Sequence, residues 1–141
     1  MGVGARRDVG YIMSPGTPEY VQSLMDGVVV LMIEKRSTVE HLEEVLSVGG
    51  VDMVQFGPAD YSLNIGLPGQ FTHPKVKEAE KYTIETAHRM GIPARAEIMD
   101  FSEADPYIDM GVKDFCIGVD LAVIHDYCKV QGEALAKTLG R

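Results

Sequence analysis

Short apolar runs alternate with helical patterns along the chain, and this alternation limits the fold more than any other feature. The runs predict strands at residues 28–33, 51–56, 92–99 and 112–119. The first run, Val-Val-Val-Leu-Met-Ile, is continuously apolar and rich in β-branched residues, as expected for a parallel strand buried on both faces. Strands that alternate with helices form a parallel sheet, so the chain is predicted to have an α/β fold.

A helix signal follows each predicted strand. The predicted helices begin at Ser37, Pro74, Ser102 and Asp120. Ser37-Thr-Val-Glu40 has the pattern of a capping box, and the long helix that begins near Pro74 ends around Met90. Residues 2–18, which contain several Gly and Pro, are predicted to be irregular. The order is therefore four consecutive βα units.

Two architectures fit this order, a (β/α)8 barrel and an open doubly wound sheet. A complete barrel needs about 250 residues. Four units in 141 residues are about half of a barrel, with two unpaired sheet edges, so we expect either a complementing partner or further residues. The sequence has no linker or low-complexity tract, which indicates one piece of one domain over residues 1–141.

Composition restricts the function class. A hydrophobic content of 45% and a charged content of 24% are typical of a soluble domain. The net charge of −8 argues against a nucleic-acid partner, which requires a basic face. The longest apolar run is too short to cross a bilayer and no signal segment is apparent, so we expect a cytoplasmic protein. Cys116 and Cys128 lack the spacing of a zinc site or disulfide scaffold and are interpreted as reduced packing residues.

Acidic residues occur at every predicted strand end, which is where ligands bind in both architectures. They are Glu34, Asp60 in Gly57-Pro-Ala-Asp60, Glu97 with Asp100, and Asp120. Glu34 and Asp60 end neighbouring strands, which lie about 4.8 Å apart in a parallel sheet. Both carboxylates can therefore reach a single cation. Oxygen ligands without histidine or thiolate favour Mg²⁺ or Mn²⁺ over zinc.

Ordinary structural roles compete with the metal hypothesis for both residues. Glu34 could be a strand-end carboxylate that pairs with Lys35 or Arg36. Asp60 follows Gly-Pro-Ala and is a natural turn or N-cap residue. Position alone does not decide between these interpretations.

An ordered set of motifs carries a family resemblance. The segments are Met32-Ile-Glu34, Val48-Gly-Gly-Val-Asp52, Phe56-Gly-Pro-Ala-Asp60-Tyr-Ser62, Gly66-Leu-Pro-Gly69, His73-Pro74 and Gly118-Val-Asp120. Together they resemble the HpcH/HpaI aldolase family and, more distantly, the citrate lyase β-subunit group. The likeness covers nearly the whole chain from about Gly2, and the ordered set is specific where Gly-Pro-Ala-Asp alone would be weak.

The resemblance implies the C-terminal half of a (β/α)8 TIM barrel and a class II, metal-dependent aldolase. Such an enzyme reversibly cleaves a 4-hydroxy-2-oxo acid to pyruvate and an aldehyde through a metal-stabilised enolate. The family's metal ligands match Glu34 and Asp60, and the ion would be Mg²⁺ or Mn²⁺, with Co²⁺ as a further candidate. Backbone amides of the Gly-Pro-Ala-Asp turn contact the pyruvate carboxylate in the family, which assigns substrate binding to Gly57, Ala59 and Asp60.

The resemblance also implies which parts of the machinery this chain does not supply. The family's pyruvate-binding arginine and histidine base lie in the first half of the barrel, so the general base is left unassigned. Arg6 and Arg7 are not assigned a catalytic role, because the family has separate basic residues in that segment. The expected partners are a small-molecule 2-keto acid, an aldehyde, and either a homo-oligomer or a complementing N-terminal barrel half. The chain alone is therefore expected to bind metal without completing a catalyst.

Arg95 and Glu97 depart from the family pattern, because they occupy a strand that family members usually keep small and apolar. A buried ion pair there would need full hydrogen bonding, and the two residues are either structural or reshape the substrate pocket. The four histidines fall in predicted helices or at helix starts, where surface or capping roles are expected. Two other functions remain open: a citryl-type lyase or decarboxylase on the same scaffold, and a non-catalytic barrel half or interaction module.

Overall fold

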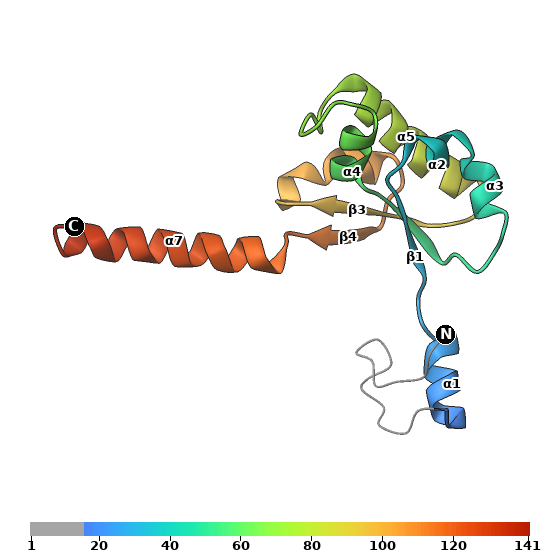
Figure 1. Ribbon diagram of the computed structural model, residues 1–141, viewed down its shortest axis with the longest axis horizontal. Helices are drawn as coiled ribbons and strands as arrows, with labels where there is room; N and C mark the ends of the chain where they lie inside the picture. Colours follow the sequence, from blue (N-terminus) through green and yellow to red (C-terminus); the bar gives the residue numbers. More distant parts are fainter. Residues whose placement is uncertain (1–15) are drawn as a thin grey trace.

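The computed structural model describes residues 16–141, and its centre is a four-stranded parallel sheet (Figure 1). The strands are β1 (Val30–Ile33), β2 (Met53–Phe56), β3 (Ala94–Ile98) and β4 (Asp114–Ile117). They lie in sequence order, β1-β2-β3-β4, and every neighbouring pair is parallel. All four predicted strands are confirmed, although each is shorter than its apolar run.

The strand order distinguishes the two candidate architectures. A doubly wound sheet reverses its strand order at a switch point and carries helices on both faces. Here the order is monotonic, and Figure 1 shows α2 to α5 on one side of the sheet. This is the arrangement of consecutive βα units in the wall of a (β/α)8 barrel. The α/β prediction of barrel type is confirmed.

The helices are α1 (Pro18–Met25), α2 (Arg36–Glu40), α3 (Leu42–Leu46), α4 (Pro58–Asn64), α5 (Pro74–Arg89), the 3₁₀ helix η2 (Phe101–Glu103), α6 (Asp105–Asp109) and α7 (Asp120–Thr138). The long helix was predicted accurately, with Pro74 in its first turn. Helices α1 and α4 were not predicted. Residues 1–15, including Arg6 and Arg7, lie outside the described part of the chain.

Two predicted helix starts are wrong, those at Ser37 and Ser102. Helix α2 begins at Arg36, whose N–H donates to Asn64 Oδ1 at 2.9 Å, so a distant side chain caps it in place of Ser37. His41 then leaves the helical conformation and separates α2 from α3. Ser102 lies within η2, where its N–H donates to the capping carboxylate of Asp100 at 2.9 Å. The predicted helix start at Asp120 is confirmed for α7, although Val119 and not Asp120 is the N-cap.

The hydrophobic core lies between the sheet and α5. Its strand residues are Ile33, Val54, Phe56, Ala94 and Ala96, and α5 contributes Val76, Ala79, Ile84 and Ala87. The alanines of β3 are almost fully buried and are small, which allows α5 to approach the sheet closely. Packing α5 on β2 and β3 fixes the loops that begin at the carboxyl ends of these strands.

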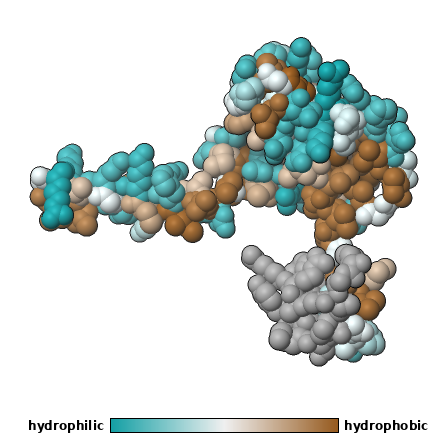
Figure 2. Space-filling view, in the orientation of Figure 1, coloured by the Kyte–Doolittle hydropathy of each residue, from teal (hydrophilic) through white to brown (hydrophobic). Residues whose placement is uncertain are grey.

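Helix α7 extends away from the sheet (Figure 1). Its apolar residues Leu121, Ile124 and Tyr127 are exposed, and Figure 2 shows apolar side chains along the part of α7 nearest the sheet. Both cysteines are free thiols, as expected; Cys116 is half-buried, whereas Cys128 is exposed, so its predicted packing role is wrong. None of the helices in residues 16–141 is long and apolar enough to span a membrane.

Candidate functional site

A cavity of about 530 Å³ lies at the carboxyl ends of β1, β2 and β3. Its lining includes all four residues that the sequence assigned to the site, Glu34, Gly57, Ala59 and Asp60. The lining also includes Phe71, Thr72, Lys77, Met99, Glu103 and Tyr107. The topology thus brings the predicted site residues to one cavity, at the end of the sheet where barrel enzymes bind their ligands.

Glu34 is the first residue after β1, and Gly57 is the first residue after β2. Because Ile33 pairs with Phe56, Glu34 and Gly57 lie next to each other at the ends of these strands. A Cβ atom at Gly57 would lie 3.2 Å from Glu34 Cβ and 3.2 Å from Met32 Sδ. Glycine therefore leaves the space that the Glu34 side chain needs. The Gly57 N–H donates to the Ile33 carbonyl at 2.9 Å, so this amide belongs to the sheet, and the binding role proposed for Gly57 is limited to its missing side chain.

Asp60 lies in the first turn of α4, which Pro58 begins. One contact anchors this turn to the end of β2, and one hydrogen bond lies within α4 itself. The Tyr61 ring packs on Phe56 with 5.0 Å between centroids, and the buried Ser62 hydroxyl donates to the Ala59 carbonyl at 2.8 Å. The amides of Ala59 and Asp60 donate to no other described residue, as expected for the first turn of a helix. They remain available to an anionic group in the cavity.

The competing structural roles for the two carboxylates find no support in the contacts. Arg36 pairs with Glu40 at 2.7 Å and not with Glu34. Asp60 is not an N-cap, because Gly57 holds that position. Within residues 16–141, neither the Glu34 nor the Asp60 side chain forms a hydrogen bond or ion pair. Both carboxylates are therefore free to bind a cation.

The carboxylates of Glu34 and Asp60 can share one metal ion, but protein side chains alone would not complete its coordination. Across the described residues, no group of three or more His, Cys, Asp or Glu side chains is placed to hold a metal ion. Two carboxylates would leave the remaining positions of an octahedral Mg²⁺ or Mn²⁺ to water and to a chelating substrate. That open coordination suits a catalytic ion better than a structural one.

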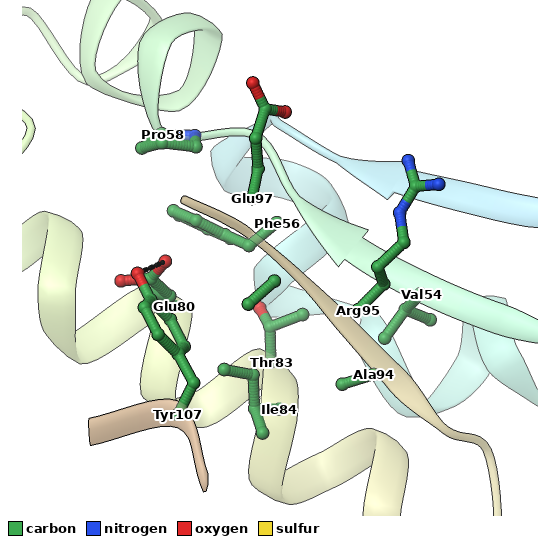
Figure 3. Close-up of a pocket in the computed structure, with 11 residues that line it drawn as sticks. Val54, Phe56, Pro58, Glu80, Thr83, Ile84, Ala94, Arg95, Glu97 and Tyr107 are labelled. Carbon is green, nitrogen blue, oxygen red and sulfur yellow. Dashed lines mark hydrogen bonds between the residues drawn. The ribbon is translucent and has the colours of Figure 1, made fainter. Parts of the chain in front are cut away.

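A hydrogen-bonded relay crosses the sheet beside the cavity, on the face opposite α5. Arg95 Nε donates to Gln55 Oε1 at 2.5 Å, and Gln55 Nε2 donates to Glu97 Oε2 at 2.8 Å. Gln55 is only 2% exposed, so its amide orientation is fixed by these two bonds. The direct Arg95–Glu97 ion pair considered from the sequence does not form, because Gln55 lies between the two charges. Figure 3 shows Arg95 and Glu97 projecting from the same side of β3.

On the other side of β3, α5 and α6 share a buried carboxylate (Figure 3). Glu80 is 7% exposed, accepts a hydrogen bond from the Tyr107 hydroxyl at 2.9 Å, and pairs with Lys77 Nζ at 2.7 Å. Burial raises the pKa of Tyr107 above its ordinary value, and the negative charge of Glu80 adds to that shift. Burial lowers the pKa of Lys77, but the hydrogen bond and charge of Glu80 outweigh it, so the net pKa is raised.

Sequence reasoning missed this Lys77–Glu80–Tyr107 cluster, although a signal exists. Glu80 follows the buried Val76 by four residues and precedes the buried Thr83 by three, which places it on the core face of α5. A carboxylate on that face requires partners. The relay through Gln55 has no comparable local signal, because it depends on the register between β2 and β3.

Of the other acidic residues at strand ends, Glu97 lines the cavity, whereas Asp100 and Asp120 do not. Asp100 caps η2, and hydrogen bonds from Ser102 lower its pKa. Asp120 accepts a hydrogen bond from the Leu121 N–H at the exposed start of α7. His73 is the N-cap of α5 and accepts from the Lys75 N–H at 3.2 Å, which confirms a capping role.

Comparison with known proteins gives consistent matches. Residues 7–126 match the family described as HpcH/HpaI aldolase/citrate lyase. The chain is 33% identical over 124 residues to a 4-hydroxy-2-oxo-heptane-1,7-dioate aldolase of Escherichia coli, covering 87% of this chain and 46% of the relative. A protein of the same name from Klebsiella pneumoniae is 32% identical over 108 residues, covering 76% of this chain and 41% of the relative. The chain thus spans about half the length of these relatives.

Solved structures show the same fold. An HpcH/HpaI aldolase from Desulfitobacterium hafniense matches with a TM-score of 0.73 and 26% identity, over 83% of this chain and 46% of that chain. The citrate synthase SbnG matches with a TM-score of 0.77 over 86% of this chain and 50% of that chain. Its identity of 21% makes it evidence for the fold alone.

Proposed function

The chain belongs to the HpcH/HpaI aldolase/citrate lyase family, and on that basis we propose that it is the C-terminal half of a divalent-metal-dependent aldolase. The complete enzyme would reversibly cleave a 4-hydroxy-2-oxo acid to pyruvate and an aldehyde. Its barrel would be completed by a further segment or by a complementing N-terminal half, and the barrel would assemble as an oligomer. Membership and homologues indicate a lyase; the metal, the substrate and the assembly are our proposal.

One observation carries the proposal: Glu34 and Asp60, whose carboxylates have no partner among residues 16–141, line one cavity from the loops that follow β1 and β2. Two such charges repel each other unless a cation lies between them. The hard oxygen donors and the open remaining coordination favour Mg²⁺ or Mn²⁺, with Co²⁺ as a further candidate. The ion would supply electrostatic stabilisation for the negative charge that develops on the keto oxygen during cleavage.

The residues of this chain would orient the 2-keto acid. The free N–H groups of Ala59 and Asp60 lie in the first turn of α4, where they can donate hydrogen bonds to a substrate carboxylate. Gly57 leaves room for the Glu34 carboxylate beside them.

In the cleavage direction the C3–C4 bond breaks, the C4 hydroxyl loses its proton to become the aldehyde, and C3 gains a proton. We assign the base for this proton transfer to the other barrel half.

The test separates metal binding from catalysis. Glu34→Ala and Asp60→Ala should each reduce Mn²⁺ affinity by at least about tenfold, measured by electron paramagnetic resonance of the free ion. Asp100→Ala is the matched control, because Asp100 is an acidic strand-end residue outside the cavity. In the complete enzyme, the same two variants should abolish pyruvate release in a coupled assay. Full Mn²⁺ affinity or full activity in either variant would disprove the site assignment.

A further inference from the structure

The cavity contains a carboxylate that the proposed metal site does not use. Glu97 lines the cavity from β3, next to the strand that carries Gly57. The registers pair Ile33 with Phe56 and Gln55 with Arg95, and continuing them places Glu34 and Glu97 on either side of Gly57. The backbones of β1 and β3 are two strand spacings apart, which is about 10 Å.

This position excludes Glu97 as a third ligand in the arrangement observed. No trio of acidic side chains among residues 16–141 is placed to hold an ion, so Glu97 is not grouped with Glu34 and Asp60. The relay instead fixes Glu97 as a polar wall of the cavity. Gln55 holds one of its carboxylate oxygens at 2.8 Å, and Arg95 holds Gln55 at 2.5 Å. The second oxygen of Glu97 has no hydrogen-bond partner within residues 16–141 and can accept a hydrogen bond.

The charges around the cavity disfavour a second anion. Lys77 is the only cationic side chain among the described lining residues, and its ammonium group is already paired with the buried Glu80 at 2.7 Å. A divalent ion would neutralise Glu34 and Asp60, but Glu97 and Glu103 would keep their negative charges. At separations of a few ångströms and an effective dielectric constant of about 20, like charges repel enough to change binding by about tenfold or more.

From these observations we propose that Glu97, held by the Arg95–Gln55 relay, is a specificity-determining residue that selects a neutral, hydroxylated aldehyde and rejects an aldehyde with its own carboxylate. This inference rests on the proposed aldolase function and deepens it. It separates this chain from the relatives at 33% identity, whose name gives a dioate as the substrate. A hydroxyl group of the aldehyde would donate to the free oxygen of Glu97, whereas a carboxylate would meet its negative charge.

The experiment measures pyruvate-dependent aldol addition by the complete enzyme to three aldehydes. Glyceraldehyde is neutral and hydroxylated, succinic semialdehyde carries a carboxylate, and 4-oxobutanamide is its uncharged analogue of similar shape. The parent enzyme should have a lower kcat/KM for succinic semialdehyde than for the other two. Glu97→Gln should raise kcat/KM for succinic semialdehyde by about tenfold, mainly through KM, and should change that for 4-oxobutanamide little.

Two further variants control for charge and position. Glu97→Asp keeps the charge and should keep the rejection of succinic semialdehyde. Glu85→Gln removes an exposed carboxylate of α5 outside the cavity and should change no ratio. The affinity for Mn²⁺, measured separately, should be the same in Glu97→Gln as in the parent.

The outcomes distinguish the two proposals. Turnover with a parent preference for succinic semialdehyde, or an unchanged preference in Glu97→Gln, overturns the specificity role alone. A loss of Mn²⁺ affinity in Glu97→Gln also overturns it, because Glu97 would then be a metal ligand. If no aldehyde is turned over by the complete enzyme, the aldolase proposal fails and this inference fails with it.

Discussion

Replacing Gly57 with alanine should weaken divalent-metal binding about tenfold without unfolding the protein. The new Cβ would lie 3.2 Å from Glu34 Cβ and 3.2 Å from Met32 Sδ, which is closer than ordinary van der Waals contact. Met32 is half-exposed and flexible, so its sulfur can move aside. Glu34 follows directly after β1, and its Cβ can move only with the backbone or by tilting the side chain.

The size of the expected loss in metal affinity follows from how little displacement of a ligand a metal site tolerates. The Glu34 side chain would have to yield by a few tenths of an ångström. Metal–ligand distances hold to within about 0.2 Å, so such a displacement is large enough to disturb coordination. Tenfold weaker binding corresponds to about 1.4 kcal/mol. The backbone at Gly57 has φ −104° and ψ 87°, which alanine can adopt, so the fold should survive.

The assay is a Mn²⁺ titration of both proteins combined with thermal unfolding followed by circular dichroism. Gly132→Ala is the matched control, because Gly132 lies in α7 and a Cβ there would meet nothing within 4 Å. It should leave Mn²⁺ affinity unchanged and stabilise the helix by about 0.5–1 kcal/mol. An unchanged Mn²⁺ affinity in a Gly57→Ala protein that unfolds like the parent would refute the spatial argument for Gly57.

Two other predictions concern stability. Asn64→Ala should lower the free energy of unfolding by about 1 kcal/mol in a denaturant titration, because Asn64 caps the Arg36 N–H at the start of α2; an unchanged midpoint would contradict this capping role. Burial, then the charge of Glu80, raises the pKa of Tyr107 above its unfolded value, so its stabilising contribution is complete below about pH 10 and is lost as the pH rises through the folded pKa. Tyr107→Phe should therefore flatten the alkaline loss of stability, and an equally steep loss would show that Tyr107 is not the group responsible.

The strands could be predicted because their signal is local. Apolar, β-branched runs bounded by Gly and Pro identify a buried strand wherever it lies in the sheet. Helix starts were less predictable, because their capping partners are not always local. The capping-box pattern at Ser37 is genuine sequence chemistry, yet Asn64 caps the helix from 28 residues away. Local propensity is therefore outweighed where a tertiary hydrogen bond satisfies an N–H group at the helix start.

The residues of the site also divide into those with a local sequence signal and those that depend on tertiary contacts. Glu34 and Asp60 could be proposed from the sequence, because residues at the ends of parallel strands meet at one edge of a sheet. The relay could not, because Gln55 looks like an isolated polar residue in an apolar strand until the register places it beside Arg95. The family resemblance assigned the amide of Gly57 to substrate, whereas the sheet uses that amide itself.

The composition of β3 explains why the relay belongs to the ligand side of the sheet. Strand β1 is apolar from Val30 to Ile33, although only Ile33 is buried and Met32 is exposed at the cavity. Strand β3 instead alternates, with Ala94, Ala96 and Ile98 buried and Glu97 exposed at the cavity. Alternation on a parallel strand indicates that one of its faces meets water or a polar ligand and not a packed core.

Because β1 is continuously apolar and β3 is not, the polar part of the barrel interior begins at Gln55 and extends toward β3, away from the strand that carries Glu34. A substrate that binds at Glu34 would therefore direct its aldehyde-derived end toward Glu97.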